Sequence, residues 1–151
     1  MSRFYDIDDA NATLVELGPI LNTLVDQRAE LVRLRDRVLA HDAAGAGGPG
    51  PGGVEGVEAG PALADDLRLT RLRMQGLIDQ MQAGVARLVA LDVQLRDIPS
   101  GLIDFPALAG GRPIWLCWRL GEGPIEFWHG HDEGFGARRP LTELESGLAT
   151  Q

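Results

Sequence analysis

The sequence predicts an α+β fold in which a long antiparallel helical hairpin is followed by a small three-stranded antiparallel sheet. Two leucine-rich stretches with helical spacing lie on either side of a segment rich in glycine and proline. After residue 99 the pattern changes to short runs of branched and aromatic residues, which are typical of strands. We therefore assign residues 1–98 to the hairpin and residues 99–151 to a β-rich module of the same folding unit.

The first helix is predicted from Asp8 onward, where Asp8 or Asp9 can accept the unpaired amide hydrogens of the first turn. Proline lacks an amide hydrogen and disfavours helical geometry at the residue before it. We therefore expect a kink or a break at Gly18 and Pro19. The apolar residues of this helix form one stripe, which comprises Leu14, Leu17, Leu21, Leu24, Leu31 and Val38.

The second helix is predicted to begin near Pro61 and to run for roughly 50 Å at about 1.5 Å per residue. Residues 43–60, between the helices, are mainly glycine, alanine and proline, and we expect a flexible linker without a function of its own. Gly84 on the apolar seam would let a partner approach closely. The seam has a 3.5-residue repeat and comprises Leu67, Met74, Leu77, Met81, Leu88, Leu91 and Leu95.

The width of these apolar stripes predicts self-association. Two helices that pack only on each other leave much of the stripes facing water, and the predicted sheet is too short to cover them. A second copy of the chain is the simplest cover, so we expect a homodimer whose hairpins form a four-helix bundle. A helical-hairpin interaction or scaffold module is accordingly one of the two functions that the sequence supports.

Three strands are predicted, at residues 102–105, 114–120 and 125–129. Residues 121–124 form the loop of a hairpin between the last two strands. If Leu120 faces Ile125 across this loop, the side chains divide between two faces, and a slip of one residue would exchange them. In that register one face holds Trp118 with Phe127 and Leu116 with His129, and the other holds Arg119 with Glu126 and Cys117 with Trp128.

The composition limits the kinds of binding partner and the cellular compartment that we expect. The net charge of -8 argues against a nucleic-acid-binding surface, because neutralising phosphates requires clustered cations. The apolar runs are too short to span a bilayer and the first residues do not resemble a secretion signal, so we expect a cytoplasmic protein. The single cysteine, Cys117, excludes an internal disulfide. It is expected to be a buried apolar residue, although a thiol can also serve as a ligand or nucleophile.

Residues 128–135 contain the densest group of candidate site residues. His129 and His131 project to the same side if the strand persists, and Asp132 or Glu133 could complete a set of two histidines and one carboxylate for zinc or ferrous iron. Two histidines this close together are also common as polar surface or as hydrogen-bonded groups at a strand end. The metal site is therefore one interpretation, with no spaced ligand motif behind it.

A second interpretation is a site for a small anionic molecule. Two arginines could clamp a carboxylate or phosphate while a histidine acts as acid or base and a tryptophan forms a wall. The sequence contains no nucleophile motif, phosphate-binding loop or dinucleotide fingerprint, so whether the chain is an enzyme stays open. The residues of this candidate site are Arg119, Glu122, Trp128, His129 and Arg138.

The chain resembles an uncharacterised bacterial family called domain of unknown function 2203. The resemblance rests on the opening residues 4–17 and on the segments Gly101-Leu-Ile-Asp-Phe-Pro106, Leu116-Cys-Trp-Arg-Leu-Gly-Glu122, Phe127-Trp-His129 and 134–141. It implies a shared polar group of Arg119, Glu122, His129, Asp132 and Arg138 but no established activity. His131 departs from the family pattern, which weakens a metal site that needs both histidines. The function we expect is binding of a small anion or a divalent metal around His129.

Overall fold

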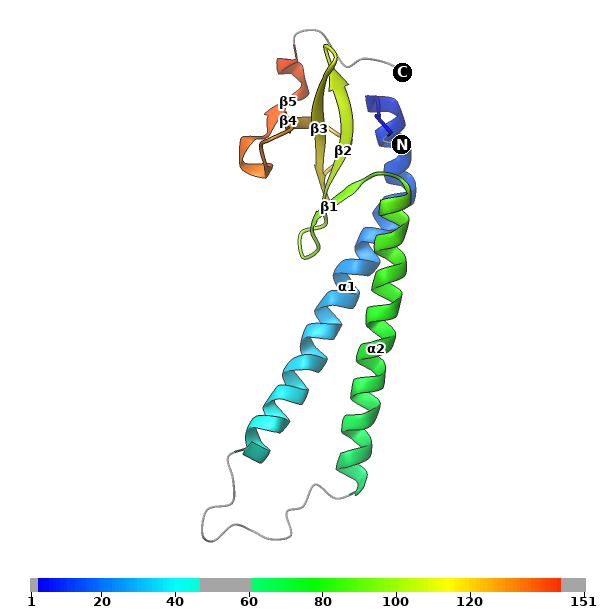
Figure 1. Cartoon of the computed structure of the whole chain (residues 1–151), viewed down its shortest axis with the longest axis vertical. Helices are drawn as coiled ribbons and strands as arrows, with labels where there is room; N and C mark the ends of the chain where they lie inside the picture. Colours follow the sequence, from blue (N-terminus) through cyan, green and yellow to red (C-terminus); the bar gives the residue numbers. More distant parts are fainter. Residues whose placement is uncertain (1–2, 47–60, 145–151) are drawn as a thin grey trace. The chain divides into compact units, whose positions relative to one another are not determined.

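The computed structural model describes residues 3–46 and 61–144, and most of the expected linker at residues 43–60 lies outside this range. Two helices, α1 (Ile7–Ala46) and α2 (Pro61–Ala90), precede the strands β1 (Gln94–Asp97), β2 (Leu102–Ala109), β3 (Arg112–Arg119), β4 (Phe127–Gly130) and β5 (Arg139–Pro140) (Figure 1). The chain divides into two compact units, residues 1–26 with 82–151 and residues 27–81. Neither described helix has an apolar stretch sufficient to cross a membrane.

Helix α1 begins at Ile7, one residue earlier than expected, and has no break. The cap is Asp6, whose Oδ1 accepts the amide hydrogen of Asp9 at 2.7 Å, and not Asp8 or Asp9. The helix continues through Pro19, so the expected break is wrong. Leu17 and Leu21, on either side of this proline, are both buried, and their packing offsets the backbone hydrogen bond that proline removes.

Helix α2 ends at Ala90, before the end of the predicted leucine repeat. The amide of Val93 donates to the Leu88 carbonyl and that of Asp92 to the Val89 carbonyl, each at 3.0 Å. Together with the φ of 60° at Asp92, these bonds form a Schellman motif that closes the helix. Leu95 therefore belongs to β1 and not to the helical seam.

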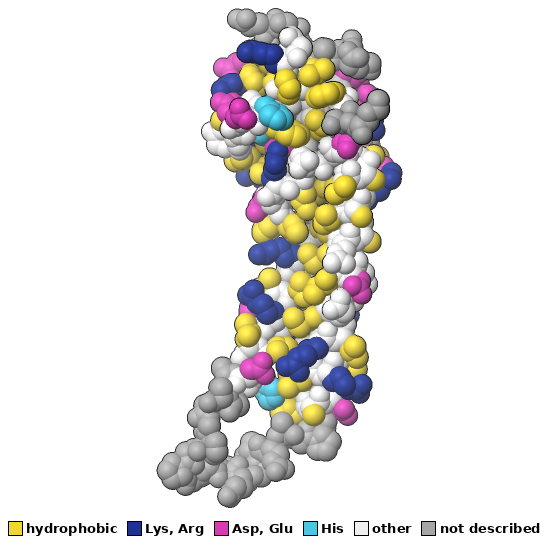
Figure 2. All heavy atoms as spheres, viewed as in Figure 1, with side chains coloured by type: hydrophobic (Ala, Val, Ile, Leu, Met, Phe, Trp, Pro, Cys, Tyr) yellow, Lys and Arg dark blue, Asp and Glu magenta, His cyan; other side chains and the backbone are white. Residues whose placement is uncertain are grey.

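The two helices lie antiparallel within each unit, as a hairpin requires. In the first unit, Glu16 forms an ion pair with Arg87, and a Cβ added at Gly84 would lie 3.2 Å from Leu24 Cδ2. In the second unit, Gln27 pairs with Gln80, and ion pairs such as the one between Arg37 and Asp66 continue the contact. On the face shown in Figure 2, hydrophobic side chains gather between the helices of this second unit. Leu34 and Leu77 are buried there.

Within the described residues, the sheet has five antiparallel strands in sequential order rather than three. Strands β2 and β3 are longer than predicted because Gly110 and Gly111, with φ of 58° and 80°, form a two-residue turn between them. Pro106 and Pro113, which we expected in the connecting loop, lie inside these strands. Each proline lies beyond the reach of one neighbouring strand, so its missing amide hydrogen breaks no ladder.

The register between β3 and β4 differs by one residue from the predicted one. Cys117 pairs with Phe127, and Trp115 with His129. One cause is that the amide of Ile125 donates to Asn11 Oδ1 at 2.8 Å, which holds this residue against α1 instead of in the hairpin ladder. The slip exchanges the faces, so His129 shares a face with Cys117 and not with Leu116.

The opposite face of the sheet forms the main core of the first unit. Its side chains come from alternate positions of β2 and β3 and are all buried. Tyr5 packs edge-on against Phe105 with ring centroids 5.0 Å apart, and its hydroxyl donates to the Leu91 carbonyl at 2.6 Å. The residues of this face are Ile103, Phe105, Ala107, Ile114, Leu116 and Trp118. The start of α1 lies beside it in Figure 1.

Candidate functional site

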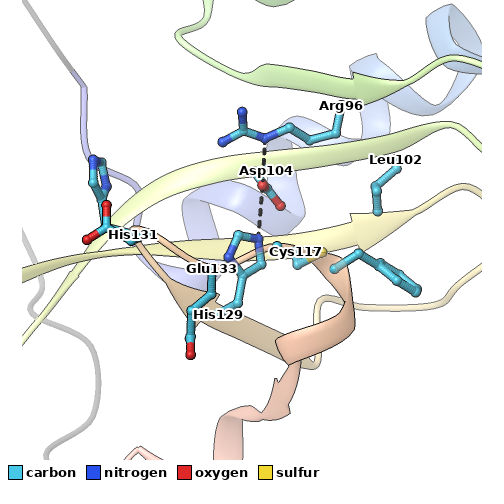
Figure 3. Close-up of a pocket in the computed structure, with 10 residues that line it drawn as sticks. Arg96, Leu102, Asp104, Cys117, His129, His131 and Glu133 are labelled. Carbon is cyan, nitrogen blue, oxygen red and sulfur yellow. Dashed lines mark hydrogen bonds and ion pairs between the residues drawn. The ribbon is translucent and has the colours of Figure 1, made fainter.

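A buried polar cluster lies on the other face of the sheet. Asp104 and His129 are 2% and 1% exposed, and His129 Nε2 lies 3.0 Å from Asp104 Oδ2. The same carboxylate oxygen accepts a hydrogen bond from Arg96 Nε at 2.8 Å. Figure 3 shows these three side chains in a row, with Cys117 beside the carboxylate and the imidazole. A buried carboxylate is therefore held between a guanidinium group and an imidazole.

The sheet positions the cluster through three adjacent strands. Asp104 lies in the middle of β2 and is paired with Cys117 of β3, while His129 comes from β4. Because the cysteine side chain is short, the imidazole can reach across β3 to the carboxylate. One donor atom each from Asp104, Cys117 and His129 lie within 4.8 Å of one another, and all three residues are buried.

Burial and the neighbouring Asp104 carboxylate raise the pKa of the Cys117 thiol to about 12. The folded protein therefore keeps this thiol protonated at neutral pH. A protonated, buried thiol is a poor nucleophile, since the thiolate is the reactive form. The arrangement disfavours covalent cysteine catalysis.

The orientation of the imidazole ring is fixed from both sides. Nδ1 of His129 lies 3.0 Å from the Gly130 carbonyl oxygen, an acceptor, so Nδ1 carries the hydrogen of that bond. Nε2 is thereby directed at the carboxylate. The second oxygen of Asp104, Oδ1, is buried and accepts no hydrogen bond from the described residues. The cluster thus presents a ring nitrogen and an unused carboxylate oxygen in a buried setting, where unsatisfied polar atoms are costly.

A pocket of about 360 Å³ opens beside the cluster. It is lined by the cluster residues Asp104, Cys117 and His129, by Arg96, by the apolar residues Leu102 and Phe135, and by residues 131–134. Glu133 in this segment is engaged, because one carboxylate oxygen accepts the Gly130 amide hydrogen at 2.7 Å and the other pairs with Arg139 at 2.8 Å. The donor cluster therefore has access to a cavity that can admit a small molecule.

The structure separates the predicted metal ligands from one another. His129, His131 and Asp132 all line the pocket, but only His129 belongs to the buried cluster. His131 is exposed and stacks on Trp115 with ring centroids 5.3 Å apart, and Figure 3 shows it well to one side of His129. Asp132 is exposed. Among the residues that the structure describes, the three-donor group is Asp104, Cys117 and His129 instead.

Two of the residues predicted to bind an anion are paired with each other. Arg138 Nη2 lies 2.8 Å from Glu122 Oε1, and both side chains are largely buried. The guanidinium also lies over the Phe127 ring at 4.0 Å. Burial raises the pKa of Glu122, but the hydrogen bonds from Arg138 and from the Arg119 amide outweigh it, and the pKa is lowered overall. Arg138 is therefore engaged by a carboxylate of this chain.

The other members of that predicted site lie apart. Arg119 is exposed, with its guanidinium 5.3 Å from the Phe135 ring centroid. Trp128 is next to His129 in β4 and so points to the opposite face of the sheet, where it contacts Arg139. Glu122, Arg138 and Arg119 thus gather around Phe135 and Phe127, while Trp128 lies elsewhere.

Sequence reasoning missed Asp104 and Arg96 as site residues. One signal for Asp104 was present, namely a charged residue in the middle of an apolar strand, between Ile103 and Phe105. A charged residue in such a position is buried only with polar or charged partners, so the pattern indicates a polar cluster on this strand. Arg96 gave no comparable signal, because it was assigned to the end of a helix.

Comparison with known families agrees with the resemblance noted from the sequence. The model of a family described as an uncharacterized conserved protein, DUF2203, matches residues 3–141. Comparison with curated proteins and with solved structures found no match. The matched region includes both helices, all five strands and the buried cluster. The chain belongs to the DUF2203 family.

Proposed function

We propose that this chain binds one divalent transition-metal ion, with zinc as the first candidate, through Asp104, Cys117 and His129. The observation that carries the proposal is the cluster of three buried donor atoms within 4.8 Å of one another beside a pocket. Carboxylate oxygen, thiolate sulfur and imidazole nitrogen are all established zinc ligands. This set replaces the two histidines and Asp132 that sequence reasoning favoured.

With three protein ligands, the proposed site would be an open one. Three protein ligands leave a fourth position of tetrahedral zinc for water or for a substrate, and here that position would face the pocket. Donor atoms around such an ion lie about 3.3 to 3.7 Å apart, so binding requires the cluster to contract by about 1 Å at its widest. The hydrogen bond from His129 Nδ1 to the Gly130 carbonyl would orient the ring, as carbonyl partners of metal-bound histidines commonly do.

Charge also favours a cation over a free anion at this site. The described lining of the pocket has three carboxylates, those of Asp104, Asp132 and Glu133. It has one arginine, Arg96. Arg138, the other arginine of the predicted clamp, is paired with Glu122. Without a metal, the Arg96 guanidinium of the lining already binds the Asp104 carboxylate, so a free anion would meet no uncompensated cation there, whereas a divalent cation would add positive charge to the site.

Cobalt(II) titration of the full chain tests the proposal. Thiolate coordination gives cobalt a near-ultraviolet charge-transfer absorption, and a tetrahedral site gives visible bands that an octahedral aqueous ion lacks. We expect both signals to saturate at one equivalent and to disappear when zinc is added. Cys117→Ala should remove the near-ultraviolet band, and His129→Gln should weaken binding by about tenfold or more.

The matched control is His131→Gln, because this histidine lines the same pocket outside the cluster. It should bind cobalt as the wild type does. Absence of saturable binding by the wild type would overturn the proposal. So would binding that survives Cys117→Ala unchanged but is lost in His131→Gln, because that result would restore the two-histidine site.

A second candidate, helix-mediated self-association, is supported by the exposed leucines of the second unit. Leu69 and Leu72 of α2 are each 58% exposed and lie three residues apart, so they are neighbours on the helix surface. The proposed occupant of this surface is a second copy of the chain. Light scattering at micromolar concentration should report a dimer for the wild type and a folded monomer for Leu72→Glu. A wild-type monomer would end this proposal.

A further inference from the structure

We infer that Arg96 binds the anionic end of a small carboxylate ligand that occupies the open coordination position of the metal. This inference rests on the proposed metal site and names the class of molecule that the site takes. It joins the two ligand types suggested by the sequence, a metal and an anion, in a single pocket.

Arg96 is aimed at the cluster by an irregularity in β1. Leu95 pairs with Ile103 and Asp97 with Leu102, so Arg96 is the extra residue of a β-bulge. Bulges redirect side chains and are frequent beside active sites. This bulge places a guanidinium against the buried carboxylate of Asp104, on the pocket side of the sheet.

The guanidinium retains donors for a ligand. Its Nε binds Asp104 Oδ2, and its Cζ lies 4.8 Å from the centroid of the Trp115 ring; these two contacts hold the group in place. The two terminal nitrogens make no hydrogen bond within the part of the chain that the structure describes, and the side chain is 40% exposed. A positioned guanidinium with free terminal nitrogens is suited to binding a carboxylate.

The charge of the metal-loaded site favours an anion. Two negative ligands, the Asp104 carboxylate and the Cys117 thiolate, neutralise a divalent ion, and His129 adds no charge. Arg96 then gives the centre of the pocket one positive charge in excess. Glu133 is paired with Arg139, and Asp132 at the mouth is exposed, where water and salt screen its charge. A monoanion would complete the balance.

Part of the pocket lining is apolar. Leu102 and Phe135 both line it, and Phe135 is 39% exposed. A ligand whose carboxylate meets Arg96 and the metal could place its carbon skeleton against these two side chains. The pocket therefore favours a small carboxylate with an apolar body over inorganic oxyanions.

Acetate and acetamide provide a matched pair of probes, since they have nearly the same shape and differ in charge. The full chain is first loaded with cobalt(II), and uptake is read from the thiolate absorption. Each probe is then titrated at constant ionic strength, and its binding is read from the visible bands. We expect acetate to shift the visible bands saturably and acetamide at equal concentration to leave them unchanged. Benzoate should bind more tightly than acetate.

Arg96→Gln should weaken acetate binding by about tenfold or more while cobalt uptake is retained, because Asp104 loses only a competing cation. Arg96→Lys keeps the charge, and its affinity for acetate should lie between those of the wild type and Arg96→Gln. Arg112→Gln is the matched control, since this exposed arginine of β3 is outside the pocket.

Acetate binding that is unaffected by Arg96→Gln, or equal binding of acetate and acetamide, would overturn the inference while leaving the metal site intact. Failure of cobalt uptake would overturn both, and the thiolate absorption reports it separately.

Discussion

The sheet is buried at its centre on both faces, but the two faces are built differently. Phe105 and Leu116 on one face have no exposed surface, and Asp104 and His129 on the other are nearly as inaccessible. The first face is stabilised by removal of apolar surface from water, which needs only complementary shape. The second depends on hydrogen bonds and opposite charges, because a buried polar group without a partner is strongly unfavourable. Burial alone therefore does not distinguish core from site in this molecule.

The largest effect is expected from truncation of the apolar face. Phe105→Ala should lower the free energy of unfolding by about 3 to 5 kcal/mol, because it removes a fully buried ring and leaves a cavity beneath Tyr5. Urea unfolding monitored by circular dichroism measures the change. The control is Phe135→Ala, at an exposed ring beside the pocket, which should cost far less. Equal losses from the two variants would mean that the pocket wall is part of the core.

A smaller loss is expected on the polar face. Asp104→Ala removes the carboxylate that accepts from Arg96 and lies against His129 Nε2, and should cost about 1 to 3 kcal/mol. His129→Ala should cost a similar amount. If the two residues stabilise the fold as a pair, the double variant should lose less than the sum of the single losses. Strict additivity in this double-mutant cycle would show that the 3.0 Å contact contributes nothing to stability.

Lowering the pH should weaken the ion pair between Glu122 and Arg138 and so destabilise the fold. The Glu122 pKa is held below its ordinary value of 4.5, so the ionised form contributes stability that is present above that pH. This contribution is lost as the pH falls below 4.5 through the lower pKa of the folded state. Glu122→Gln should remove about 1 kcal/mol at pH 7 and flatten the acid limb of the stability profile. The exposed Glu126→Gln is the control, and an acid limb that is unchanged in Glu122→Gln would contradict the assignment.

The helices were predictable because their stabilising interactions repeat along the sequence. Leucines at spacings of three and four residues identified both helices, and the structure confirms an antiparallel hairpin. The end of α2 was missed because Asp92, rather than glycine, adopts the left-handed conformation of the Schellman motif. The leucine spacing happens to continue to Leu95, which hid β1. A regular repeat thus identifies a helix more reliably than it identifies the helix end.

The site was less predictable because it depends on contacts between distant residues. His129 was correctly placed at the end of a strand, but its partner depends on the strand register, and Asn11 of α1 contributes to that register through Ile125. No local pattern contains this information. The pairing of Arg138 with Glu122 likewise requires the segment after β4 to return to the loop before it. Residue types near His129 indicated polar chemistry, whereas the identity of the cluster required the three-dimensional sheet.

The smallest change in stability is expected at Cys117, on the polar face of the sheet. Cys117→Ala removes one buried sulfur atom and no charge, so the free energy of unfolding should fall by less than about 1 kcal/mol. Because its pKa is raised to about 12, the wild-type thiol should resist iodoacetamide at pH 8 in the folded chain and react readily in urea. Mass spectrometry of the alkylated protein measures this difference. Rapid alkylation of the folded chain would show that the polar face opens on the timescale of the reaction. Slow alkylation, combined with loss of the cobalt thiolate absorption in Cys117→Ala, would identify a residue that matters little to the fold and much to the site.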